Sequence, residues 1–241
     1  MNAPVSTSIR FKMKISYRSN HILEARSTLY GVVSALFSDP ESEKFSMLTA
    51  PRLQECVLNE CLQLEELDDQ KKSNLLRSFK KLIAKLEKLG LEKIKDEFVG
   101  VFGHTLSKQI APYALEHLKS ADVFFRTQKL ADLNGFYKAF GVEVESIERA
   151  DHISTQTEFL SLLLLKELMA SQNELCDEKE VCETAFTNFQ NDHFLDWVVM
   201  YAENLATHID GEFYPSAGRF LWEFLKKEKI GLQTSEVSQY T

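Results

Sequence analysis

The sequence contains two Asp–His dipeptides, which are its most conspicuous candidates for a functional site. Asp151 and His152 stand in E-R-A-D-H-I-S-T-Q-T-E-F-L, directly before a long apolar run, and Asp192 and His193 stand in F-Q-N-D-H-F-L-D-W. A carboxylate beside an imidazole can act in acid–base catalysis, bind a metal ion or recognise a cationic ligand. The plainest alternative is structural, with Asp151 capping a helix by accepting hydrogen bonds from backbone N–H groups.

The rest of the sequence offers little support for an enzyme. Catalysis by such a pair needs a nucleophile and an oxyanion site, and there is no G-x-S-x-G motif or cysteine in an activating context. All-α metal-dependent phosphohydrolases carry the order His then Asp, whereas both pairs here read Asp then His. The remaining histidines lack H-E-x-x-H or E-x-x-H spacing, and no glycine-rich phosphate loop occurs. We expect no catalytic residue, no metal and no cofactor, with such a phosphohydrolase as an alternative.

The composition favours helices and reduced cysteines. Of 241 residues, 44% are hydrophobic and 27% charged, which is ordinary for a globular protein, and nine glycines and five prolines are few for a turn-rich β architecture. The four cysteines are spaced C-x4-C and C-x5-C, which fits neither a zinc knuckle nor a redox C-x-x-C motif. We therefore expect reduced thiols in a cytoplasmic protein.

The charge is unevenly distributed along the chain. The net charge is −8, yet the first twenty residues hold four basic and no acidic side chains, so the remainder sums to −12. An acidic body disfavours nucleic acid and suits a cationic partner such as a basic peptide. The basic start lacks the apolar run of a secretory signal, and no stretch reaches the roughly 20 apolar residues of a membrane span. We expect a mobile basic arm at residues 1–19 and no membrane insertion.

Apolar residues recur at helical spacing almost throughout the chain, and no segment shows the alternation typical of a strand. We predict one all-α domain at residues 20–232, a helical bundle of about ten helices, followed by a polar tail at 233–241. Gly90 is expected to end one helix and Gly141 another. Helices are expected at 20–37, 45–64, about 69–89, 91–102, 115–140, 151–170, 178–190, 192–209 and 214–229. Aromatic residues at helical spacing are expected in the core, namely Phe98, Phe102, Phe124, Phe125, Phe136, Tyr137, Phe140, Trp197 and Trp222.

Several motifs in order resemble the TorD/DmsD/NarJ family of cytoplasmic maturation chaperones for molybdenum-containing redox enzymes. They are D-E-F-V-G-V-F-G at 96–103, A-P-Y at 111–113, G-F-Y-K-A-F-G at 135–141, the block around the first Asp–His pair, and the Trp of D-H-F-L-D-W. The resemblance spans roughly residues 25–225, and the R-x-D-H-I block followed by E-F-L is its most specific part. The chain departs from the family pattern at Ala150, Gln156 and Thr157, where the family has Pro, Glu and Leu.

The resemblance implies a TorD-like helical fold and a chaperone that binds the N-terminal signal of a molybdenum oxidoreductase catalytic subunit until cofactor insertion. In the family this signal is often a twin-arginine export peptide, whereas the nitrate reductase branch binds an N-terminus without an export signal, and both stay open here. The family associates the loop around P-Y and the D-H block with that recognition. Carried over by position, the implied peptide-binding residues are Pro112, Tyr113, Asp151, His152 and Glu158.

A helix starting near Asp151 would align Asp151, Thr155 and Glu158 on one face. Such an acidic strip could bind guanidinium groups through bidentate hydrogen bonds, with His152 tuning it near neutral pH. We therefore predict that the first Asp–His pair recognises a peptide and performs no bond-making chemistry. A scaffold that binds a folded partner is the other alternative, and the chain is expected to be a monomer or a helix-swapped homodimer.

Overall fold

The computed structural model describes residues 19–66, 74–103, 110–118, 122–144 and 148–238, and side chains as far as residue 228. In this part of the chain there is no β-strand, only an isolated antiparallel bridge between Tyr113 and His152, so the all-α prediction is confirmed. The α-helices are α1 (Asn20–Leu36), α2 (Glu43–Ser46), α3 (Pro51–Glu66), α4 (Leu75–Phe102), α5 (Val123–Ala139), α6 (Ile153–Gln172), α7 (Cys176–Phe189), α8 (Leu195–Ala206) and α9 (Phe213–Ser238). Single turns of other helical types are η1 (Met47–Thr49), η2 (Ala114–His117) and the π-helical η3 (Gln190–Phe194).

Eight of the helices in the described ranges have twelve or more residues, so the expected count of about ten is too high. The helices expected on either side of Gly90 form one element, α4, with a kink at φ 71° and ψ 166° at this glycine. That backbone conformation is open essentially only to glycine, so the local break was predicted correctly. The helix expected from residue 115 begins only at Val123, because Asp122 caps it by accepting the Phe124 N–H at 2.9 Å.

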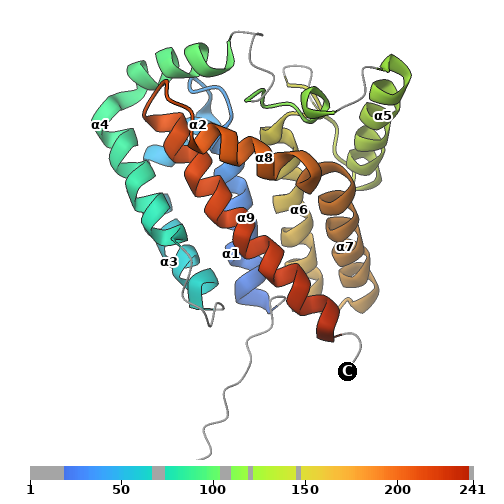
Figure 1. Ribbon diagram of the computed structural model, residues 1–241. Coiled ribbons are helices and arrows are strands. Elements are labelled where there is room, and N and C mark those ends of the chain that lie inside the picture. The colour runs from blue at the N-terminus through green and yellow to red at the C-terminus, as the bar shows by residue number, and fades with distance from the viewer. Residues whose placement is uncertain (1–18, 67–73, 104–109, 119–121, 145–147, 239–241) are drawn as a thin grey trace, which may run out of the picture.

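Helices α1 and α6 form the centre of the bundle and run antiparallel (Figure 1). Two reciprocal serine pairs two turns apart hold them together, since each hydroxyl donates to the backbone carbonyl of its partner at 2.7–2.9 Å. The pairs are Ser27 with Ser161 and Ser34 with Ser154. Small side chains at these positions let the two backbones approach closely, and the hydroxyls remain satisfied in the buried seam.

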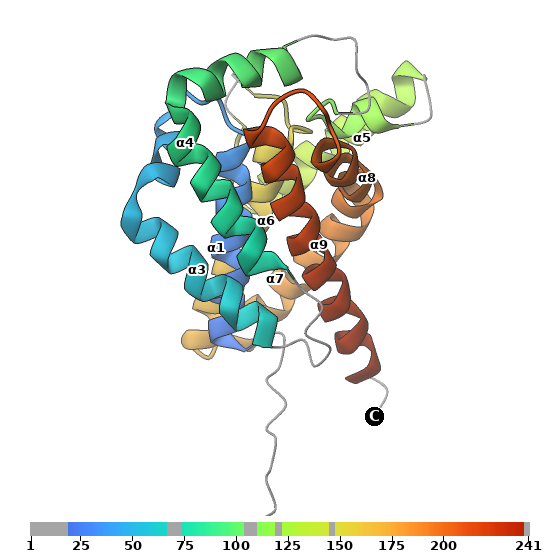
Figure 2. The same cartoon turned by 60° about the vertical axis from the view of Figure 1, so that its left-hand side comes forward.

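The other long helices surround this pair. Helices α3 and α4 lie on one side and α7 and α8 on the other, with α9 packed against both α4 and α8 (Figures 1 and 2). A buried ion pair joins α1 to α9, because Arg26 donates from Nε and Nη2 to the two carboxylate oxygens of Glu228 at 2.9 Å each. Tyr30 also donates to Glu228 at 2.8 Å. A bidentate geometry with further hydrogen bonds is what such a buried pair requires.

Helix α5 is the peripheral element of the bundle (Figure 1). Only Leu133 and Tyr137 of α5 are buried, and Tyr137 anchors it by donating to the Ala150 carbonyl at 2.7 Å. The expectation that the aromatic residues lie in the core is wrong at the start of α5, where Phe124 is 88% exposed. Helical spacing identifies a face but does not ensure that another helix covers it.

The predicted ends of the chain fall largely outside the described residues. Only Ser19 of the expected basic arm is described, and the expected cap at residues 68–69 is not. The backbone of residues 233–238, expected to be a polar tail, is helical and continues α9. None of the described helices has the length and apolar character needed to cross a membrane. All four cysteines are free thiols, two exposed and two buried.

Candidate functional site

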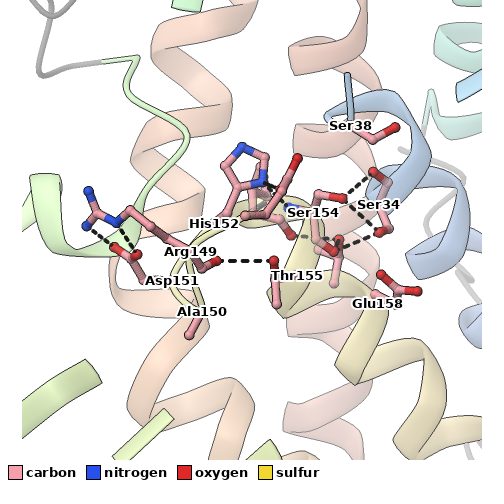
Figure 3. Close-up of polar contacts among 12 residues, drawn as sticks. Ser34, Ser38, Arg149, Ala150, Asp151, His152, Ser154, Thr155 and Glu158 are labelled. Atoms are coloured by element: carbon pink, nitrogen blue, oxygen red, sulfur yellow. Dashed lines mark hydrogen bonds and ion pairs between the residues drawn. The ribbon is translucent and has the colours of Figure 1, made fainter. Parts of the chain in front are cut away.

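The carboxylate of Asp151 is completely buried and fully engaged within the protein. It accepts hydrogen bonds from Nε and Nη2 of Arg149 at 2.9 Å each and from the Leu115 backbone N–H at 3.0 Å (Figure 3). Asp151 lies two residues before α6, so it does not belong to the helix. A carboxylate held by a guanidinium and a buried amide positions the surrounding chain, because removing it would leave those donors unpaired.

His152, rather than Asp151, caps α6. Its backbone is extended, with φ −70° and ψ 143°, and its Nδ1 accepts the Ser154 N–H at 3.2 Å. The same nitrogen lies 2.5 Å from a carboxylate oxygen of Glu148. Neutral imidazole accepts from Ser154 at Nδ1, whereas a protonated Nδ1 donates to Glu148, so the two contacts are alternatives. The imidazole is 4% exposed, which leaves it little access to a ligand.

Backbone hydrogen bonds attach Pro112 and Tyr113 to the start of α6. The Ile153 N–H donates to the Pro112 carbonyl and the Ala114 N–H to the Asp151 carbonyl, both at 2.9 Å. Pro112 is buried, whereas Tyr113 is half-buried, with the Arg149 guanidinium 4.5 Å from its ring centroid. Burial raises the pKa of the Tyr113 hydroxyl, with Glu148 adding to the effect. The motif residues 112–113 and 151–152 therefore form one joined structure.

Thr155 and Glu158 form the accessible part of the predicted strip. Thr155 is half-buried and donates to the Arg149 carbonyl at 3.2 Å, while the Glu158 side chain is 64% exposed and forms an ion pair with Lys44. Asp151 points to Arg149, on the opposite side of the segment from Glu158 (Figure 3). The structure thus brings Thr155 and Glu158 onto one exposed face of α6 without Asp151, because the helix starts after that residue.

The second Asp–His pair lies in the π-helical turn η3. Asp192 is exposed, and His193 is half-buried with its ring 5.2 Å from Phe136 and 5.5 Å from Phe189. Burial lowers the pKa of His193, and repulsion from Lys129 lowers it further. These residues border an open cavity of about 700 Å³ between α5, η3 and α8, whose carboxylates come from Asp132, Asp192 and Asp196.

An apolar surface adjoins this cavity at the start of α5. Val123, Phe124 and Phe125 are 73%, 88% and 39% exposed. Phe124 and Phe125 line a second cavity of about 390 Å³, and Ala131 lines both cavities, which makes the surface continuous along α5. Sequence reasoning missed this surface, although three consecutive apolar residues directly after the capping Asp122 are a signal, since a helix cannot bury all three on one side.

The described residues were also compared with the ligand sets of metal sites. Across the described ranges, no group of three or more His, Cys, Asp or Glu side chains is placed to hold a metal ion. The described polar groups of the site are instead a buried, internally paired corner around Asp151, with the half-buried Tyr113 against Arg149, and an exposed carboxylate at Glu158 on the other side of the segment. Such an arrangement can bind another chain without supplying a nucleophile.

The fold defines an all-α protein, and the comparisons identify its family. A model of the nitrate reductase delta subunit family matches residues 65–203, which is more than half of the chain and includes both Asp–His pairs. The chain therefore belongs to this family, and the predicted resemblance to the TorD/DmsD/NarJ group is confirmed. It is also similar to Chaperone protein TorD of Photobacterium profundum, with 27% identity over 143 residues. That alignment covers 58% of this chain and 64% of the relative, which is less than two thirds of the relative's length.

Proposed function

We propose that this protein is a cytoplasmic, non-catalytic maturation chaperone that binds the N-terminal segment of a molybdenum oxidoreductase catalytic subunit until its cofactor is inserted. Membership of the nitrate reductase delta subunit family and the similarity to a TorD chaperone support this class. We propose that it acts as a monomer or as a helix-swapped homodimer.

The observation that carries the proposal is the uncovered apolar turn at the start of α5. Val123 and Phe124 are each more than 70% exposed and lie beside Phe125. Contiguous exposed aromatic surface is unusual on a globular protein and marks a binding site for another apolar segment. The α5 helix is tied to the neighbouring 114–117 turn, because Arg126 bonds to the Leu115 carbonyl and to the Glu116 carboxylate. The helix that carries the apolar turn is therefore attached to the 114–117 turn, which directly follows Tyr113 in the chain.

Cationic side chains of the bound segment would contact the polar part of this surface. We assign direct contacts to Tyr113, Thr155 and Glu158, which are accessible. Pro112, Asp151 and His152 are buried, so we assign them the role of positioning residues that hold Tyr113 and the first turn of α6 in place. The acidic net charge of −8 favours the approach of a basic segment over longer distances.

Calorimetry with an isolated peptide tests this proposal. The probe is a synthetic signal peptide with two adjacent arginines before an apolar stretch, and the matched probe carries glutamine at both arginines. We expect the first peptide to bind, Phe124→Ser to weaken binding at least about tenfold through lost apolar burial, and Glu158→Gln to weaken it about two- to fivefold. Phe124 is exposed, so its replacement should leave the free energy of unfolding unchanged, which a denaturation curve checks.

Three results separate the alternatives. Failure of both peptides to bind would reject the proposed function and favour a scaffold that recognises a folded partner. Equal binding of the two peptides would favour a client without paired arginines, as in the nitrate reductase branch. Stoichiometric metal in the purified protein, with phosphoester cleavage, would support the phosphohydrolase alternative instead.

A further inference from the structure

The exposed carboxylate of Glu158 already holds a cation of this chain. Lys44 forms an ion pair with Oε2 of Glu158 and also donates to the Ser154 hydroxyl at 3.3 Å. Ser154 belongs to the serine pair that joins α1 to α6, so Lys44 reaches the edge of the central seam. A positively charged group therefore occupies the position where the proposed function needs the cationic side chain of the client.

The short helix α2 keeps Lys44 in this position. Ser42 caps α2 by accepting the Phe45 N–H at 3.1 Å, and the side chain of Phe45 is completely buried. Phe45 thus anchors α2 to the core directly next to Lys44. The lysine side chain itself remains 33% exposed and the Glu158 side chain 64% exposed, so water and dissolved ions reach the pair.

We propose that Lys44 is a resident cation that competes with the client's arginine for Glu158 and thereby sets the selectivity of the site. The inference rests on the proposed function. Lys44 meets a single carboxylate oxygen, whereas a guanidinium can donate to both oxygens in a planar fork. A client arginine can therefore replace Lys44 with two hydrogen bonds to Glu158, whereas a client lysine would donate one, so the exchange favours arginine over lysine.

The exposure of the pair makes this exchange feasible. Ion pairs between exposed side chains contribute little net stability because water and salt screen them, so a competing cation can replace one partner. The Arg26–Glu228 pair of the same protein illustrates the opposite case, with both side chains at most 1% exposed and no path for an incoming cation. Of these two pairs, only Lys44–Glu158 can act as an exchangeable contact.

Removal of Lys44 tests the inference against a matched control. Lys85 is paired with the exposed Glu212, and its side chain is 34% exposed against 33% for Lys44, so Lys85→Met changes the net charge equally at an ion pair that does not involve Glu158. We expect Lys44→Met to bind the two-arginine peptide about two- to fivefold more tightly than the wild type, as expected for loss of an exposed ion pair. Lys85→Met should match the wild type. The gain should vanish in Lys44→Met combined with Glu158→Gln.

The outcomes separate this inference from the proposed function. Equal affinities of Lys44→Met, Lys85→Met and wild type would overturn the competition alone, as would weaker binding by Lys44→Met. Binding of the peptide to neither the wild type nor Lys44→Met would overturn both. Lys44→Arg provides a further check, because a resident guanidinium should compete better and weaken peptide binding below that of the wild type. Circular dichroism of each variant confirms that the fold is retained.

Discussion

The two Asp–His pairs of this chain have the same residues in the same order, yet they occupy opposite environments. Asp151 and His152 are buried, and their polar atoms bond within the protein, to Arg149, Leu115 and Ser154 among others. Asp192 is exposed, and with His193 it borders an open cavity of about 700 Å³. The first pair is enclosed and bonded within the protein, whereas the second combines an exposed carboxylate with a half-buried imidazole.

The difference shows that an Asp–His dipeptide has no intrinsic role. The first pair precedes an α-helix and faces the 112–115 segment, so its backbone and side chains are used for capping and bridging. The second pair lies in a π-helical turn, where one extra residue widens the helix and turns side chains out of the regular register. The position of the dipeptide in or before a helix, rather than its residue types, therefore determines whether its carboxylate is accessible to a ligand.

The largest expected contrast is in stability. Asp151→Ala leaves the buried Leu115 N–H without its acceptor and removes two hydrogen bonds from Arg149, so we expect a loss of about 2–3 kcal/mol in the free energy of unfolding. Asp192→Ala removes an exposed side chain and should change it by less than about 0.5 kcal/mol. Chemical denaturation of both variants measures the difference, and similar losses for the two would show that burial does not distinguish the pairs.

A smaller effect is expected from the helix cap. His152→Ala removes the acceptor of the Ser154 N–H and should cost about 1 kcal/mol. His152→Asn restores a good capping side chain and should recover most of that loss. Thermal or urea denaturation of the two variants gives the comparison. If asparagine destabilises as much as alanine, the contact with Glu148, and not the cap, is the important role of His152.

The second pair should make stability depend on acid pH. Burial holds the pKa of His193 below its ordinary value, so the unfolded chain takes up the proton first as the pH falls. The corresponding stability is fully present above about pH 6.5, the value in an unfolded chain, and is lost as the pH falls through the lower pKa of the folded protein. His117, whose pKa is also lowered mainly by burial, contributes in the same direction. The urea concentration at the unfolding midpoint should fall less steeply between neutral and acid pH in His193→Gln than in the wild type. If the midpoints of the two proteins fall in parallel with pH, His193 does not cause the pH dependence.

The smallest expected effect concerns peptide binding at the second pair. Asp192→Asn should change the affinity for the two-arginine peptide by less than about twofold, because exposed charges away from the contact contribute little. Glu158→Gln is the matched variant, since it also removes one exposed carboxylate. A larger effect at Asp192 than at Glu158 would move the cationic contact from α6 to the cavity beside α5.

Much of the fold followed from local pattern. Helical periodicity and scarce glycine and proline predicted the all-α class, and Gly90 and Asp122 mark local events at single positions. The count of helices was less accurate, because hydrogen bonding resumes directly after Gly90 and the turn at 114–117 stays short. Among the candidate site residues, Tyr113, Thr155 and Glu158 are accessible, whereas the burial of Asp151 depends on Leu115, which is 36 positions away in the chain.

Sequence was sufficient to predict the helical class and the family resemblance, because periodicity and motifs are local properties of the chain. Three features could be learned from the tertiary structure alone: Asp151 is buried, Phe124 is exposed, and Lys44 forms an ion pair with Glu158. The physical reason is that exposure and ion pairing depend on which distant segments cover a residue. Lys44 and Glu158 are 114 positions apart, and no local pattern relates them.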